Sequence, residues 1–148
     1  MTDPTAADIA AAVLAAAPTD ADTADAMAQL ADAAGHMSTV LFNYRRNTPD
    51  APDLDRALNL ELALDQRAIE LRTQAVKVLG GQAGAAIAQV KDASKKVDDF
   101  LAGVKKVEGQ LVIASAVICL ASAALVGDAG GVLTAVVGVH DALKSAQA

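Results

Sequence analysis

The fold of this chain is decided by GQLVIASAVICLASAALVG, residues 109–127, a stretch without a single charged side chain. Alanine and leucine, both good helix formers, fill much of it and predict a helix. Nineteen residues would make a helix of about 28 Å at 1.5 Å per residue. A helix that is apolar on every side must be shielded from water, either by other helices or by lipid.

The composition of the whole chain also favours helices. Its 148 residues suffice for one domain with a real core. Apolar residues make up 53% of the chain but aromatic residues only 2%, and alanine supplies much of the apolar count. Residues that favour strands are scarce outside the C-terminal third. We therefore expect an all-α protein, a bundle of four to five helices in a single domain spanning residues 1–148.

Prolines and glycines divide the chain into five expected helices, at about 4–17, 19–46, 53–79, 82–126 and 131–146. The clearest break is the loop NTPDAPD, residues 47–53, with two prolines and two aspartates. Acidic, alanine-rich helices occupy 1–46, and amphipathic bundle helices occupy 53–108. Residues 109–146 form an apolar hairpin that closes the bundle.

The third expected helix carries apolar residues on two faces, about 200° apart at 100° per residue. One face holds Leu58, Leu62, Ile69 and Val76, and the other holds Leu60, Leu64, Leu71 and Val78. A helix with two opposed apolar faces packs between neighbours rather than against one. We therefore expect this helix to be central.

The fourth expected helix, about 82–126, has apolar residues at alternating steps of three and four, as in a coiled coil. Its first half contributes Ile87, Val90, Val97, Leu101 and Val104 to this seam, which continues to residue 125. Unbroken, the helix would be a rod of about 67 Å. Gly103 and Gly109 are the two positions where it would bend. The seam predicts self-association.

The apolar hairpin, residues 109–140, has two interpretations. Its length suits a membrane-inserting segment, and Lys105 and Lys106 precede it as a flank would. A buried helix explains it equally well, and three features favour burial: many small residues, no aromatic residue after Phe100, and a return arm, 132–139, too short to span a bilayer. The residues expected to act there are Leu111, Val112, Ile113, Val117, Ile118, Leu120, Leu125, Val132 and Val136.

Residues with catalytic or metal-binding chemistry do not form a recognisable motif. Glu61 and Asp65 lie one turn apart with Arg72, which favours a strip of ion pairs between helices over a metal site, because neither histidine stands in a Glu-x-x-His pair. Cys119 lies in the apolar run, where we expect an inert, packed thiol. We therefore expect no catalytic, metal or cofactor site and no small-molecule substrate.

The charge distribution narrows the functional classes further. The net charge is −6, and no basic face is evident, so nucleic acid is not an expected partner. Asp3 and Asp8 stand where a signal peptide would carry basic residues, so we expect no secretory signal and a cytoplasmic protein by default, with membrane association as the alternative.

These observations together predict a non-enzymatic interaction protein. It would form a homo-oligomer, or bind a helical partner, through the seam 87–125 and the apolar hairpin. The alternative is a membrane-active protein, pore-forming or membrane-inserting, that releases or inserts residues 109–140.

Overall fold

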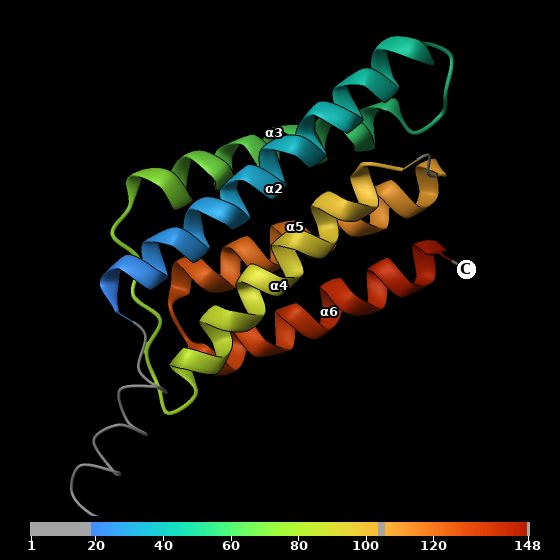
Figure 1. Ribbon diagram of the computed structural model, residues 1–148. Coiled ribbons are helices and arrows are strands. Elements are labelled where there is room, and N and C mark those ends of the chain that lie inside the picture. The colour runs from blue at the N-terminus through green and yellow to red at the C-terminus, as the bar shows by residue number, and fades with distance from the viewer. Residues whose placement is uncertain (1–18, 104–105, 148) are drawn as a thin grey trace, which may run out of the picture.

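The computed structural model describes residues 19–103 and 106–147, and over these ranges the protein is all-α. Five helices are seen: α2 (Asp20–Asn47), α3 (Leu54–Thr73), α4 (Ala83–Leu101), α5 (Val107–Val126) and α6 (Ala129–Gln147) (Figure 1). The all-α bundle expected from the sequence is confirmed. The helix expected at about 4–17 lies outside the described residues.

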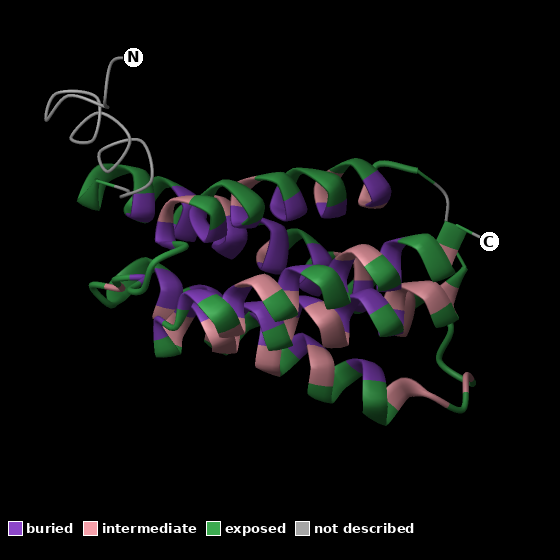
Figure 2. Cartoon of the chain, turned by 90° about the horizontal axis from the view of Figure 1, so that it is seen from below, coloured by how far each residue is buried: buried purple, intermediate pink, exposed green. Residues whose placement is uncertain are grey.

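The helices alternate in direction along the bundle, so that α2, α4 and α6 run opposite to α3 and α5 (Figure 1). Their main contacts follow the order α2, α3, α5, α6, α4 and back to α2, and α2 also touches α5 across the middle. The two helices with three main neighbours each are therefore α2 and α5. Figure 2 shows the buried residues on the sides where the helices face one another.

Small side chains allow the helices to approach closely. Alanine contributes many of the fully buried positions, notably Ala26, Ala31, Ala33 and Ala34 of α2 and Ala114, Ala121 and Ala124 of α5. The larger buried side chains are aliphatic, for example Leu30, Leu64 and Ile113. The abundance of alanine in the sequence is therefore a packing feature as well as a helix-forming one.

The ends of the first two helices are fixed by local hydrogen bonds. Thr19 caps α2 by accepting a hydrogen bond from the amide of Asp22 at 3.0 Å, and the Asp22 carboxylate accepts from Thr19 in return. The hydrogen bonds from Thr19 lower the pKa of Asp22. After α2, the Tyr44 hydroxyl donates to Asp53, which holds the 48–53 loop and raises the pKa of Tyr44.

The prediction of a single long helix at about 82–126 is wrong. The chain forms two helices, α4 and α5, and Gly103 lies in the break between them. One of the two glycines expected to permit a bend therefore marks the end of a helix instead. The physical reason is burial, because a straight rod would leave both halves of its apolar seam uncovered, whereas two shorter helices each pack into the bundle.

The extent and the place of the third helix also differ from expectation. Helix α3 ends at Thr73, and residues 74–78 run without regular structure before the single bridge at Leu79. Leu58, Leu62 and Ile69 are exposed, at 36%, 58% and 56%, while Leu64 and Leu71 are buried. Helix α3 is thus apolar on two sides but covered on one, and the positions with three neighbours belong to α2 and α5.

The segment after α3 is anchored to the turn between α5 and α6. The amide of Leu79 donates to the Gly127 carbonyl at 2.8 Å, and the amide of Ala129 donates to the Leu79 carbonyl at 3.1 Å. Gly127 ends α5 with a φ of 84°, in the left-handed region that favours glycine. A Cβ at this position would also collide with the carbonyl oxygen of Lys77. This junction fixes the hairpin α5–α6 against the rest of the bundle.

We therefore predict that Gly127→Ala destabilises the protein. The left-handed backbone costs an L-residue about 1–2 kcal/mol, and the collision with Lys77 adds to this cost. Urea unfolding followed by circular dichroism measures the effect. Gly81→Ala is the matched control, since a Cβ there meets no atom within 4 Å and the free energy of unfolding should change by less than about 0.5 kcal/mol. Equal effects of the two substitutions would contradict the anchoring role.

Candidate functional site

The coiled-coil seam of α4 is used inside the chain. Ile87, Val90 and Val97 are 4%, 0% and 1% exposed, and Leu101 is partly buried. Val104 lies outside the described residues. These side chains face the neighbouring helices of α4, which are α2 and α6. The surface that the sequence predicts for self-association is therefore largely occupied by the protein's own core.

Most of the expected hairpin residues are also core residues. The buried ones are Leu111, Ile113, Val117, Leu120, Val132 and Val136. Ile118 and Leu125 are partly buried and pack against the same core. Val112 alone of the nine is classed as exposed, at 44%. The hairpin thus contributes its larger side chains to the bundle and leaves one narrow side of α5 uncovered.

This uncovered side of α5, which we call the α5 face, carries Val112, Cys119 and Val126 at intervals of seven residues. Val126 is 81% exposed, and Cys119 is exposed as well. Partly buried small residues flank these three, namely Ser115, Ala116, Ser122 and Ala123. No acidic or basic residue occurs from Gly109 to Val126. The α5 face is therefore apolar, smooth and uncharged over the length of the helix.

Helix α6 borders the α5 face on one side. Gly109 and Ala146 bring the two helices together, because a Cβ on Gly109 would lie only 2.8 Å from the Cβ of Ala146. On its outer side α6 exposes Val137, at 59%, next to Gly138. On the other side of α5 the Arg67 side chain of α3 donates to Ser122 at 3.1 Å and marks the polar border of the face.

Cys119 is not the packed thiol that the sequence predicts. It is the middle exposed residue of the α5 face and is not part of a disulfide. The heptad spacing of residues 112, 119 and 126 shows that they share one side of the helix, but spacing alone does not reveal which side of an all-apolar helix faces outward. The exposure of Val126 and Val137 escaped sequence reasoning for the same reason.

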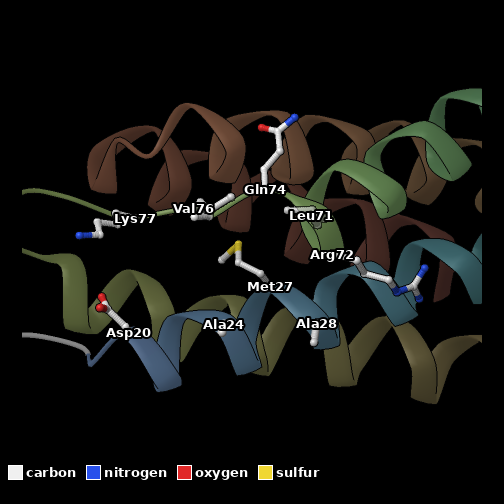
Figure 3. A pocket seen from close by; sticks show the side chains of 10 residues that line it. Asp20, Ala24, Met27, Ala28, Leu71, Arg72, Gln74, Val76 and Lys77 are labelled. Atoms are coloured by element: carbon white, nitrogen blue, oxygen red, sulfur yellow. The ribbon is translucent and has the colours of Figure 1, made fainter.

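A groove of about 390 Å³ lies at the opposite end of the bundle from the C-terminus, between the start of α2 and the segment that follows α3 (Figure 3). Met27, Leu71 and Val76 form its apolar part, and Asp20, Arg72 and Lys77 lie along its length. The guanidinium of Arg72 already bonds Asp32 at 2.8 Å. The groove offers apolar contact and separated charges, without a nucleophile beside a base.

Two histidine–aspartate pairs connect α4 to its neighbours. His36 of α2 lies 2.8 Å from Asp98, and His140 of α6 lies 3.7 Å from Asp92. The His36 side chain is exposed as well as paired with Asp98. Beside it, the Thr39 hydroxyl donates to the carbonyl of Gly35, a local helix bond. These pairs join helices.

The predicted strip of ion pairs between helices is found in part, because Glu61 and Arg72 pair with side chains of α2 whereas Asp65 is exposed. Glu61 is 8% exposed, and Arg45 of α2 bonds it at 2.7 Å. This hydrogen bond raises the pKa of Arg45. Arg72 makes the second pair between the same two helices, with Asp32. In the part of the chain that the structure describes, no three His, Cys, Asp or Glu side chains gather as a metal site would require.

Helix α5 meets the length and composition of a membrane span. Within the described ranges it is the one such helix, with a mean hydropathy of 2.2 in its most apolar window, 39% of which is buried. A core helix of a soluble protein meets the same criteria. The partial burial separates α5 from a fully internal helix, because a fully internal helix would have no exposed side.

No family model, curated protein or solved structure matches this chain. The arguments that follow therefore rest on the residues of the chain itself.

The exposure of Cys119 predicts rapid labelling of the folded protein. In dilute solution without denaturant, a maleimide should modify the thiol at nearly the rate seen in urea, because the side chain lies on the surface. Mass spectrometry and absorbance assays measure both rates. Labelling that required unfolding would show that Cys119 is enclosed and that the α5 face does not exist.

Proposed function

We propose that this chain is a non-enzymatic helical protein that self-associates through the α5 face. One observation carries the proposal: a helix without any charge over residues 109–126 leaves Val112, Cys119 and Val126 exposed. Outer sides of bundle helices normally carry charged and polar residues. An uncharged, apolar outer side indicates a surface that is covered in the working state of the protein.

The size of the surface suits a protein interface. Helix α5 has 20 residues and is about 30 Å long. At one helix width of about 10 Å, its uncovered side offers roughly 300 Å². A standard interface buries about 800 Å² on each partner. The α5 face therefore suits a small interface in which one helix packs against another.

The arrangement of the α5 face favours a second copy as the partner. Its three exposed residues are symmetric about Cys119, so an antiparallel copy would place Val112 against the copy's Val126. Self-complementarity of this kind is what a two-fold interface requires. The small flanking residues would let two α5 helices approach closely, as small residues do where helices cross.

A membrane-active protein is the second candidate, supported by the length and hydropathy of α5. Two features place it second. Small side chains gain less from lipid than leucine or aromatic residues do, and the α5 face has neither aromatic residues nor a basic rim along its length. The net charge of −6 also disfavours binding to anionic membrane surfaces, which attract basic peripheral proteins.

The first experiment measures the mass of the protein in solution. Wild type should exceed the monomer mass at micromolar concentrations, and Val112→Glu combined with Val126→Glu should reduce it to the monomer, because association would bury unpaired charges. Sedimentation equilibrium gives the masses, and circular dichroism verifies that the variant is folded. The rate of Cys119 labelling provides a second readout, since it should fall with protein concentration in wild type only.

Leu79→Glu is the matched control, because Leu79 is 67% exposed but lies outside the α5 face. It should keep the wild-type mass. Identical masses for wild type, the double variant and the control would overturn the proposal. Val117→Asp and Leu120→Asp, by contrast, should unfold the protein, since both side chains are 1% exposed and belong to the core.

The second experiment separates the two candidates. Flotation with neutral and with anionic lipid vesicles should leave wild type in the dense fraction, since the lipid-facing gain of the α5 face is small. Flotation of wild type that Val112→Glu with Val126→Glu abolishes, and Leu79→Glu does not, would instead establish the membrane function.

A further inference from the structure

A second apolar surface lies on α3, on the side that its neighbours α2 and α5 leave open. Leu58, Leu62 and Ile69 are exposed there. Charged residues complete the row, which we call the α3 stripe: Asp55, Leu58, Leu62, Asp65, Ile69 and Arg72. All three charged members are exposed. Successive members are three, four, three, four and three residues apart, the spacing by which one helix meets another in a coiled coil.

The spacing of the residues in the stripe reads the same in both directions. Against an antiparallel second copy, Leu58 would meet the copy's Ile69, and Leu62 would meet the copy's Asp65. At the two ends, Asp55 would meet the copy's Arg72. The stripe is thus self-complementary in its spacing and in the charges at its two ends, and each end pair occurs twice because the arrangement is two-fold symmetric.

Asp55 and Arg72, the charges at the two ends of the stripe, cannot form an ion pair with each other within one chain. Asp55 and Arg72 are 17 positions apart on α3, about 25 Å at 1.5 Å per residue, which is far beyond the reach of a salt bridge. Arg72 bonds Asp32 through one nitrogen, Nη2. Its guanidinium carries five N–H donors, so it can bind a second carboxylate at the same time. The Arg72 side chain is 47% exposed and accessible to a partner.

The neighbouring helix widens the stripe. Phe42 of α2 is 44% exposed, and its ring centre lies 5.8 Å from the guanidinium of Arg45, which in turn bonds Glu61 of α3. This chain of contacts places Phe42 along the border of α3, near the stripe. An aromatic side chain at the edge adds apolar area to a helix pair that would otherwise be narrow.

We propose that the α3 stripe is a second, weaker interface, which pairs two copies of this chain with their α3 helices antiparallel. It is weak because one helix face buries less than the about 800 Å² of a standard interface. The two Asp65 carboxylates would also lie near the two-fold axis, where their like charges oppose pairing. The stripe lies on a different helix from the α5 face, so the two interfaces can act at once and link copies into larger assemblies.

The test uses the full chain carrying Val112→Glu and Val126→Glu, so that the α5 face does not contribute, at concentrations well above the micromolar range in which this variant should be monomeric. Sedimentation equilibrium of Asp55→Arg and of Arg72→Asp should show dimer constants weakened roughly fivefold, because each exposed ion pair is small but occurs twice. The charge-swapped double variant should recover the constant of the parent. Asp32 loses its partner Arg72 both in Arg72→Asp and in the double variant. A dimer constant that recovers from the first variant to the second therefore reports only the ion pairs between chains.

A gain in affinity provides the second arm. Asp65→Leu should strengthen the dimer at least about tenfold, since it removes the central repulsion and adds two buried leucines. Gln66→Leu is the matched control, because Gln66 is exposed on the same helix but outside the stripe. Equal strengthening by both substitutions would indicate general stickiness and overturn the proposal, as would a parent that stays monomeric at all concentrations.

The outcomes of the two proposals are distinguishable. Loss of association in the α5-face variant with no response to any α3 substitution would retain the α5 face and reject the stripe. An α5-face variant that keeps the wild-type mass and still responds to the charge swap would reject the α5 face and retain the stripe.

Discussion

The constraint on which this structure depends is the need to surround α5. Over residues 109–126 the helix has no charged side chain, so no side of it is suited to water. Contacts with α2, α3 and α6 cover three sides and bury four of its large side chains, Leu111, Ile113, Val117 and Leu120. The described helices do not extend to the fourth side. The mostly small side chains there limit the free-energy cost of exposure, and that side remains as the α5 face.

The close approach of the helices follows from small residues at specific contacts. Alanines line the buried sides of α2 and α5, and Gly109 allows α6 to pack tightly beside α5. Gly127 serves a different purpose, because its left-handed backbone lets the α5–α6 turn form hydrogen bonds with the extended segment around Leu79. Packing and hydrogen bonding at this junction hold the hairpin in one position relative to α2 and α3.

The two exposed apolar surfaces differ in chemistry and therefore in what they suit. The α5 face has no charge along its length, which favours an association that stays closed. The α3 stripe alternates apolar residues with Asp65 and ends in opposite charges, which fix the direction and register of a partner helix at the cost of affinity. The two proposed interfaces, one uncharged and one direction-specific, would together suit an assembly that grows and disassembles with concentration.

The sequence by itself determined the all-α class, most helix boundaries and the use of Glu61 and Arg72 in ion pairs to another helix, because these depend on local propensity, punctuation and the spacing of residues along one helix. The partners of these pairs, Arg45 and Asp32, were decided by the packing of α2 against α3. Tertiary structure alone decided that residues 82–126 form two helices rather than one, since that outcome depends on whether folding back buries more surface than a straight rod. It also decided that α2 and α5, not α3, have three neighbours. The heptad pair Val90 and Val97 and the heptad pair Leu62 and Ile69 look alike in sequence, yet the first is buried and the second is exposed. A periodic pattern identifies an apolar side of a helix, but only the placement of the neighbouring helices determines which apolar side is covered.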